Sequence, residues 1–124
     1  MATRPLVQDT NALQITLRQA GRRFRILELS GVLNYYTARR LPAAYRALVE
    51  EEGRALHRLI LDLRSVQSFD ATGAAALLEV VRDAETRAFG FWIADRAERP
   101  TYIATGLRDR LKFLTPEDAE RLGV

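Results

Sequence analysis

Apolar and polar residues alternate in the first part of the chain. The stretch Leu13–Gln19 (LQITLRQ) alternates strictly, which is typical of a strand with one buried face. Residues 20–23 (AGRR) form a turn signal ahead of a second apolar run, Phe24–Gly31, so the two runs predict a β-hairpin. Residues 1–12 lack the apolar core of a signal peptide, and we expect a polar tail followed by a single domain over residues 13–124.

The pattern changes to a helical period after the hairpin. Apolar residues then recur at intervals of three and four, at Leu41, Ala44, Tyr45 and Leu48. Thr37 could cap the start of this helix and Gly53 could end it. Pro42 fits a first turn but not a helix interior, so the helix either starts near Leu41 or kinks there.

Two buried strands and a long helix are predicted next. The run His57–Leu63 (HRLILDL) is almost continuously apolar, as in a central strand covered on both faces. Residues 72–88 predict an amphipathic helix, and a further buried strand follows at Phe89–Asp95. We expect the apolar stripe of the helix to contain Ala75, Leu78 and Val81.

The last quarter of the chain predicts smaller elements. A short helix has Pro100 near its first turn and Gly106 as its stop. Lys112–Leu114 could be a short edge strand, and a final helix has Thr115 as N-cap and Pro116 as its first residue. The predicted order is β-β-α-β-α-β-α-β-α, an α/β fold with a mixed sheet of about five strands and about four helices packed on it.

Composition narrows the possible functions. The 124 residues include no cysteine, which excludes disulfides, thiolate nucleophiles and zinc–thiolate sites. The formal charge is +3, but the basic residues do not gather with aromatic residues, so we expect no nucleic-acid partner. No apolar run reaches the ~18 residues of a membrane span. We therefore expect a cytoplasmic protein with no direct membrane insertion.

The sequence offers little for catalysis. His57 is the only histidine, so a Ser-His or Cys-His pair has little to build on, and no glycine-rich phosphate loop is present. Asp62 ends a strand as in phospho-accepting receiver domains, but the acidic pair that would hold Mg²⁺ is missing. We expect a strand-end hydrogen-bonding role for Asp62, and we predict a non-enzymatic protein with no catalytic residue, cofactor or metal site.

The junction at Asp70–Ala74 (DATGA) is the main candidate site. Asp70 is placed to be an N-cap that accepts a hydrogen bond from the N–H of Thr72 or Gly73. The glycine and the following alanines leave a turn with almost no side chains, which another backbone can approach closely. The junction is either a structural cap alone or a docking surface where a phosphate on a first-turn hydroxyl would be favoured.

Three stretches in register resemble the STAS domain, the fold of bacterial anti-sigma-factor antagonists. The stretch LELSGVLNYYTARRL is similar to the family's second strand, its L-x-G-x-L turn and its first helix. The stretch LILDLRSVQSFDATGAAALLEVV is similar to the signature LDLSxVxFxDSSGLxxLL. The stretch TGLRDRLKFLTPEDA is similar to the closing motif that ends in PSxEEA. Together they span roughly residues 24 to 119.

The resemblance implies a binding switch. Such antagonists bind an anti-sigma factor, commonly a GHKL-type serine kinase, and so release a sigma factor. The kinase phosphorylates the serine directly after the aspartate, and a phosphatase reverses this. Here that position is Ala71, which cannot accept phosphate, and Thr72 falls on the second serine. The resemblance therefore implies a switch that is either lost or moved to Thr72.

The resemblance also implies which residues meet a partner. Family partners contact the start of the second helix, here Asp70–Ala74, and the loop before the first helix, here Asn34, Tyr35, Tyr36 and Thr37. Asn34 fits a turn-capping role, and the tyrosines are either interface anchors or a pair with one ring in the core. Alternative functions are a STAS subunit of another assembly, such as a phospholipid ABC transporter or a stress-signalling complex, and a small-ligand or nucleotide sensor. The oligomeric state stays open.

Overall fold

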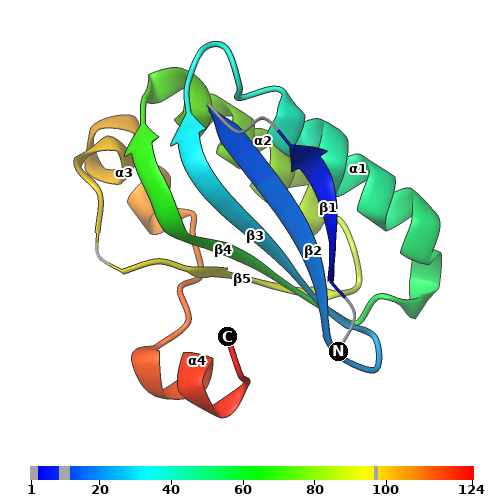
Figure 1. The fold of residues 1–124 in the computed structure, drawn as a ribbon. Coiled ribbons are helices and arrows are strands. Elements are labelled where there is room, and N and C mark those ends of the chain that lie inside the picture. The colour runs from blue at the N-terminus through cyan, green and yellow to red at the C-terminus, as the bar shows by residue number, and fades with distance from the viewer. Residues whose placement is uncertain (1–2, 9–11, 97) are drawn as a thin grey trace.

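A computed structural model describes residues 3–8, 12–96 and 98–124. Its centre is one five-stranded sheet with the order β1-β2-β3-β4-β5 (Figure 1). The strands are β1 (Thr3–Gln8), β2 (Leu13–Gly21), β3 (Phe24–Leu33), β4 (Arg58–Phe69) and β5 (Gly90–Ala94). Strand β2 runs antiparallel to both of its neighbours, β1 and β3, whereas β3, β4 and β5 run parallel to one another. The sheet is therefore mixed, as predicted.

Helices cover the two faces of the sheet unequally. They are α1 (Arg40–Glu52), α2 (Ala71–Glu85), α3 (Pro100–Thr105) and α4 (Pro116–Arg121), with single 3₁₀ turns η1 (Gly53–Ala55) and η2 (Leu107–Asp109). The first three helices and η2 contribute to the main core, whereas the segment around α4 packs over a smaller cluster on the other face (Figure 1). The predicted fold class, with about five strands and four helices, is confirmed.

Several local predictions are also confirmed. Helix α1 begins at Arg40, which places Pro42 in its first turn without a kink, and Gly53 follows its last residue. Gly106 adopts a left-handed conformation (φ 74°) at the end of α3. Thr115 caps α4, since its hydroxyl accepts from the N–H of Asp118 at 3.1 Å. The apolar run Leu59–Leu63 is buried, as expected for a central strand.

The predicted polar tail over residues 1–12 is wrong for Thr3–Gln8, which form β1. This strand pairs antiparallel with β2 at the edge of the sheet. An edge strand needs hydrogen bonds to only one neighbour and tolerates proline, so Pro5 and the absence of alternation do not prevent it. Arg4 also links β1 to α1 through an ion pair with Glu51 (2.5 Å). Residues 1, 2 and 9–11 lie outside the described part of the chain.

The predicted edge strand at Lys112–Leu114 is reduced to a single bridge. Phe113 pairs with Ile93 alone, so this segment prolongs the sheet by one contact and not by a strand. The fifth strand is instead β1, at the opposite edge.

The predicted stripe of α2 is right for Val81 and wrong for the other two residues. Ala75 is exposed and Leu78 is half-buried, whereas the buried face contains Ala74, Leu77, Val80, Val81 and Ala84. Three consecutive alanines carry no information about which side faces the core, because their side chains are equally apolar. The register therefore had to be set by the sheet.

Candidate protein-docking site

Both predicted docking segments lie at the carboxyl end of the parallel strands. Leu33 at the end of β3 pairs with Phe69 at the end of β4, so the segments that follow these strands begin side by side. The N–H of Asp70 donates to the carbonyl oxygen of Leu33 at 3.3 Å. Sites in open α/β sheets form at such edges. We call the surface made by Tyr35, Tyr36, Ala71, Thr72 and Ala75 the docking edge; all five are exposed.

The start of α2 is capped and pressed against β3. Oδ1 of Asp70 accepts from the N–H of Gly73 at 2.9 Å, which confirms the predicted N-cap. A Cβ on Gly73 would lie 2.4 Å from the carbonyl oxygen of Leu33. Gly73 and Ala74 are buried, so the small residues allow the backbone of β3, and not that of a partner, to approach closely here. Of the five predicted residues Asp70–Ala74, only the first three are exposed.

Thr72 stands in the first turn of α2 with its side chain exposed. Among the described residues, no group hydrogen-bonds its hydroxyl. Ala71, at the family's usual acceptor position, is exposed as well. The two side chains leave the helix about 100° apart, because an α-helix has ~3.6 residues per turn.

The loop before α1 is fixed by its own polar side chains. Oδ1 of Asn34 accepts from the N–H of Tyr36 at 2.9 Å, which confirms the expected turn-capping role. The Thr37 hydroxyl accepts from the N–H of Asn34 at 3.0 Å and donates to the carbonyl oxygen of Val32 at 2.7 Å. The prediction that Thr37 caps α1 is wrong, because this buried hydroxyl closes the preceding turn and the helix begins only at Arg40.

This fixed loop holds both tyrosines outward. The side chains of Tyr35 and Tyr36 are 74% and 84% exposed, and their rings meet edge-to-face with centroids 5.4 Å apart. The alternative of one ring in the core is therefore wrong. Two neighbouring exposed aromatic rings on a rigid turn form an amphipathic contact surface of low conformational entropy.

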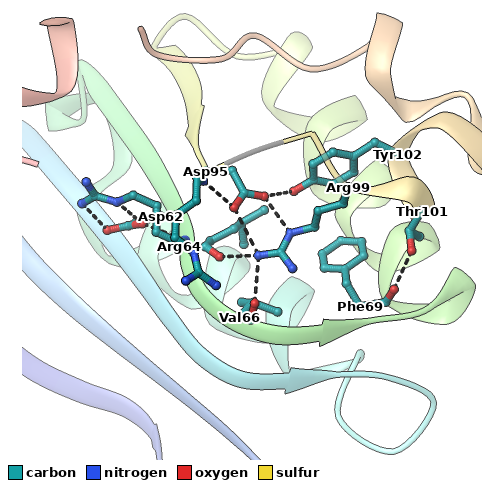
Figure 2. A network of polar contacts seen from close by, with 10 residues as sticks. Asp62, Arg64, Val66, Phe69, Asp95, Arg99, Thr101 and Tyr102 are labelled. Atoms are coloured by element: carbon teal, nitrogen blue, oxygen red, sulfur yellow. Dashed lines mark hydrogen bonds and ion pairs between the residues drawn. The ribbon is translucent and has the colours of Figure 1, made fainter. Parts of the chain in front are cut away.

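A buried polar network holds α3 beside this edge (Figure 2). Asp95, whose side chain is 3% exposed, accepts from Arg99 Nε at 2.7 Å and from the Tyr102 hydroxyl at 2.6 Å. Nη2 of Arg99 also donates to the carbonyl oxygens of Leu63 (2.8 Å) and Val66 (2.9 Å) in β4. Burial, together with Asp95, raises the pKa of Tyr102 well above its ordinary value. The network keeps these charges compensated and fixes α3 to β4.

Sequence reasoning missed this network and one exposed residue near it. Thr101 in α3 donates to the carbonyl oxygen of Phe69 at 2.6 Å, which places α3 beside the start of α2. Ile103 of α3 is 59% exposed. The spacing of Asp95 and Arg99 is four residues, but it spans a strand end and a helix start, so no periodicity indicated the pair.

The other polar candidates are internally satisfied. Asp62 is buried and accepts from the backbone N–H of Arg64 (3.0 Å) and from its guanidinium (2.9 Å), which confirms a hydrogen-bonding role. Its predicted place at a strand end is wrong, because β4 continues to Phe69. Within residues 3–8, 12–96 and 98–124, no group of three or more side chains could hold a metal ion. No helix formed by these residues is long and apolar enough to cross a membrane.

Comparisons with known proteins agree with this geometry. A family model described as "Mlab, STAS domain" matches residues 14–95, more than half of the chain. The chain belongs to the STAS domain family. The predicted family is thus confirmed, and the matched residues include the first two of the three sequence stretches and both segments of the docking edge. No curated protein matches the sequence.

Solved structures share the fold at low sequence identity. An anti-sigma factor antagonist from Mycobacterium paratuberculosis is 21% identical with a TM-score of 0.72, over 93% of this chain and 97% of that one. The unphosphorylated antagonist SpoIIAA is 18% identical with a TM-score of 0.65, over 89% and 97%. The murine anion transporter Slc26a9 is 18% identical with a TM-score of 0.66, over 97% of this chain and 21% of that one.

Proposed function

We propose that this STAS domain is a regulatory binding module of the anti-sigma-factor antagonist type. Through the docking edge it binds an anti-sigma factor, a GHKL-type serine kinase, in the cytoplasm and so releases a sigma factor. The observation that carries the proposal is the pair of exposed rings of Tyr35 and Tyr36 beside the start of α2. Aromatic anchors of this kind supply most of the free energy at protein interfaces.

Binding fits this edge better than catalysis does. The carboxylate of Asp70 accepts from Gly73, and the hydroxyl of Thr37 donates to Val32, so both groups already have internal roles. A general base needs a side chain free to take a proton from substrate. The side chains left free at the edge are two tyrosines, a threonine and two alanines, which suit contact with a protein surface.

The phosphorylation switch is altered in this chain. Ala71 occupies the family's usual acceptor position, so we propose that a kinase reading that position cannot inactivate the domain. Thr72 is the remaining exposed hydroxyl of the first turn. A phosphate there would add a charge of about −1.5 to −2 in the middle of the docking edge and would oppose docking, and a phosphatase would restore it.

A second candidate function is a STAS subunit of another assembly. The matched family model carries the description Mlab, and the Slc26a9 structure shows that a STAS fold can be one part of a larger chain. Phospholipid ABC transporters and stress-signalling complexes are assemblies of this kind, and a small-ligand sensor is a further alternative. All of the assembly functions would use a protein-docking surface, so the partner's identity separates them.

Affinity capture from native lysate, with bound proteins identified by mass spectrometry, tests the proposal. We expect an anti-sigma factor of the GHKL kinase type to be recovered with the wild type. Purified partner should then bind the Tyr36→Ala variant about 30-fold more weakly, as for an anchor worth about 2 kcal/mol. Glu117→Ala, an exposed change on α4, is the control. Recovery of ABC-transporter subunits instead would establish the second candidate.

The captured kinase also tests the switch. Incubation with ATP followed by site mapping should place phosphate on Thr72 or nowhere, and Ala71→Ser should gain a phosphate at position 71. If Thr72 stays unmodified and Thr72→Ala binds the partner normally, the switch is lost. If Ala71→Ser also stays unmodified, this kinase does not read the family position at all.

A further inference from the structure

Arginines without an acidic partner gather at the end of the molecule opposite the docking edge. Arg22 and Arg23 form the turn between β2 and β3, Arg54 lies in η1, and Arg58 is the first residue of β4. We call these four residues the basic end. Arg58 pairs with Phe24 and Gly90 at the amino-terminal ends of the parallel strands. Figure 1 shows the β2–β3 turn at the bottom and the loop after β3 at the top.

Direct contacts join the β2–β3 turn at Arg23 to the start of β4. The carbonyl oxygen of Arg23 accepts from the N–H of His57 at 2.9 Å and of Arg58 at 3.1 Å. A guanidinium nitrogen of Arg23 lies 3.2 Å from Nε2 of His57. Arg22 and Arg23 line one shallow hollow of about 670 Å³, and Arg54 and His57 line a second of about 650 Å³. Arg22, Arg23 and Arg54 therefore border two neighbouring open hollows, and Arg58 flanks them at the start of β4.

The nearby carboxylates do not neutralise this surface. Glu51 pairs with Arg4, Glu52 with Arg25, and Asp83 with Arg87, at 2.5, 2.8 and 2.9 Å. Glu50 is the acid of the last turn of α1 that has no ion-pair partner among the described residues. None of the four arginines of the basic end forms an ion pair with a described carboxylate. The basic end thus keeps a strong net positive charge.

Arg23 occupies a conformation that does not favour arginine. Its φ is 61°, and among the described residues it is the only non-glycine residue with a positive φ. Glycine adopts this region without a Cβ penalty, whereas a side chain is disfavoured there. The turn therefore carries a guanidinium at a position where glycine would fold more easily.

The chemistry of the basic end points to a surface of phosphate groups. The large apolar side chains exposed in the described residues are Tyr35, Tyr36, Ile103 and Phe113, and none belongs to this end. A specific protein interface needs an apolar centre, and a small-molecule site needs an enclosed pocket. Arginine forks match phosphate oxygens, and a fixed array of them needs only an extended anionic surface.

We propose that the basic end binds the anionic phospholipid headgroups of a membrane surface. The arginines lie in the headgroup region and no part of the chain enters the lipid. Each basic residue near an anionic membrane strengthens binding about fivefold, so four of them supply about 10³-fold in all. The attraction weakens within a Debye length and is screened by salt.

Vesicle co-sedimentation with the full chain tests this proposal. We expect binding to vesicles of phosphatidylcholine mixed with phosphatidylglycerol, no binding to phosphatidylcholine alone, and loss of binding at high salt. Arg22→Gln, Arg54→Gln and Arg58→Gln should each weaken binding about fivefold. Arg96→Gln is the matched control, because Arg96 is an exposed arginine without an ion pair at the carboxyl end of β5.

Arg23→Gly separates binding from folding. This variant should bind the anionic vesicles about fivefold more weakly while its Tm stays equal to or above that of the wild type. Absence of binding to anionic vesicles overturns the proposal, as does an equal loss with Arg96→Gln. Tighter binding to duplex DNA than to the anionic vesicles would assign the basic end to nucleic acid instead. Tyr36→Ala should leave vesicle binding unchanged, so this test is independent of the proposed partner.

Discussion

At the scale of single residues, Gly73 decides how closely α2 meets the sheet. Its missing side chain lets the helix start lie against the end of β3, and a Cβ there would be 2.4 Å from a backbone oxygen. The flexible end of a side chain can move away, but backbone cannot without shifting the strand. The small residue in the family signature thus has a structural role in this chain, next to an exposed Thr72.

Gly73→Ala should therefore lower the free energy of unfolding by about 3 kcal/mol, as overpacking does in a rigid site. Ala71→Ser, an exposed change in the same turn, should alter it by less than about 0.5 kcal/mol. Chemical denaturation of both variants measures the difference. Equal stability of Gly73→Ala and wild type would mean that α2 can move away from β3 at little cost.

Two buried tyrosines make stability depend on alkaline pH. Burial and the carboxylates of Asp83 and Asp95 raise the pKa of Tyr45 and Tyr102 above the ordinary value of about 10. The native state then keeps protons that the unfolded chain releases, so stability is complete below pH ~10 and falls as pH rises further. Each tyrosine should contribute a slope of up to about 1.4 kcal/mol per pH unit.

Urea denaturation between neutral pH and the onset of alkaline unfolding measures this slope. Tyr45→Phe and Tyr102→Phe should each reduce the slope by the share of one tyrosine proton, whatever the substitutions do to stability at neutral pH. An unchanged slope in both variants would show that these hydroxyls ionise equally in the native and unfolded chains.

Sequence reasoning succeeded at residues whose role is local. Asp70 and Thr115 were identified as N-caps because a cap depends on the next three residues. The exposure of Tyr35 and Tyr36 could not be decided, because it depends on hydrogen bonds made by Asn34 and Thr37 within the folded loop. Thr37 itself was misassigned, since its hydroxyl accepts from the N–H of Asn34 in the loop and not from an N–H of the helix.

At the scale of elements, α4 and the residues after it close the less covered face of the sheet. Leu114, Leu122 and Val124 pack over a small cluster that contains Phe24, Ile26, Ile60 and Ala94. The guanidinium of Arg18 also donates to the carbonyl oxygen of Gly123 at 3.0 Å. This short C-terminal segment therefore shields apolar strand residues that would otherwise face water.

Removal of residues 115–124 should lower Tm and increase self-association relative to the intact chain, because it uncovers this cluster. Thr115→Ala is the matched control. Loss of the cap should lower its free energy of unfolding by about 1 kcal/mol, but the cluster stays covered. Thermal unfolding and light scattering compare the two. A truncated chain with unchanged Tm and mass would show that α4 contributes no cover.

Element prediction from the sequence was strongest where periodicity was strong. The hairpin, the two longer helices and the buried strands produce clear periods. Strand β1 does not, because one neighbour and a few backbone bonds are enough to hold an edge strand that contains Pro5. The segment Lys112–Leu114 was predicted as an edge strand, but it pairs with β5 only at Ile93.

At the scale of the whole molecule, the two proposed surfaces lie at opposite ends of the sheet. The docking edge follows the carboxyl ends of β3 and β4, and the basic end surrounds their amino ends. A partner bound at one end leaves the other uncovered. We expect the domain to bind a protein and an anionic membrane surface at the same time.

The effects of variants at the two ends should therefore be independent. The Tyr36→Ala/Arg58→Gln double variant should show the partner affinity of the first single variant and the vesicle affinity of the second, because distant sites that share no contacts act additively. Titration of partner against vesicle-bound protein measures this. Competition between partner and vesicles would place the two surfaces in contact or couple them through the sheet.

Trp92 gives the chain its own optical probe. It is the only tryptophan, it packs in the small cluster beside α4, and a Cβ on Gly90 would lie 2.4 Å from its ring. The ammonium group of Lys112 lies 5.7 Å from the ring centroid. The fluorescence of Trp92 should therefore change when the C-terminal segment is released and stay constant when a protein binds at Tyr35 and Tyr36. Spectroscopy can thus follow unfolding of one face while the other is occupied.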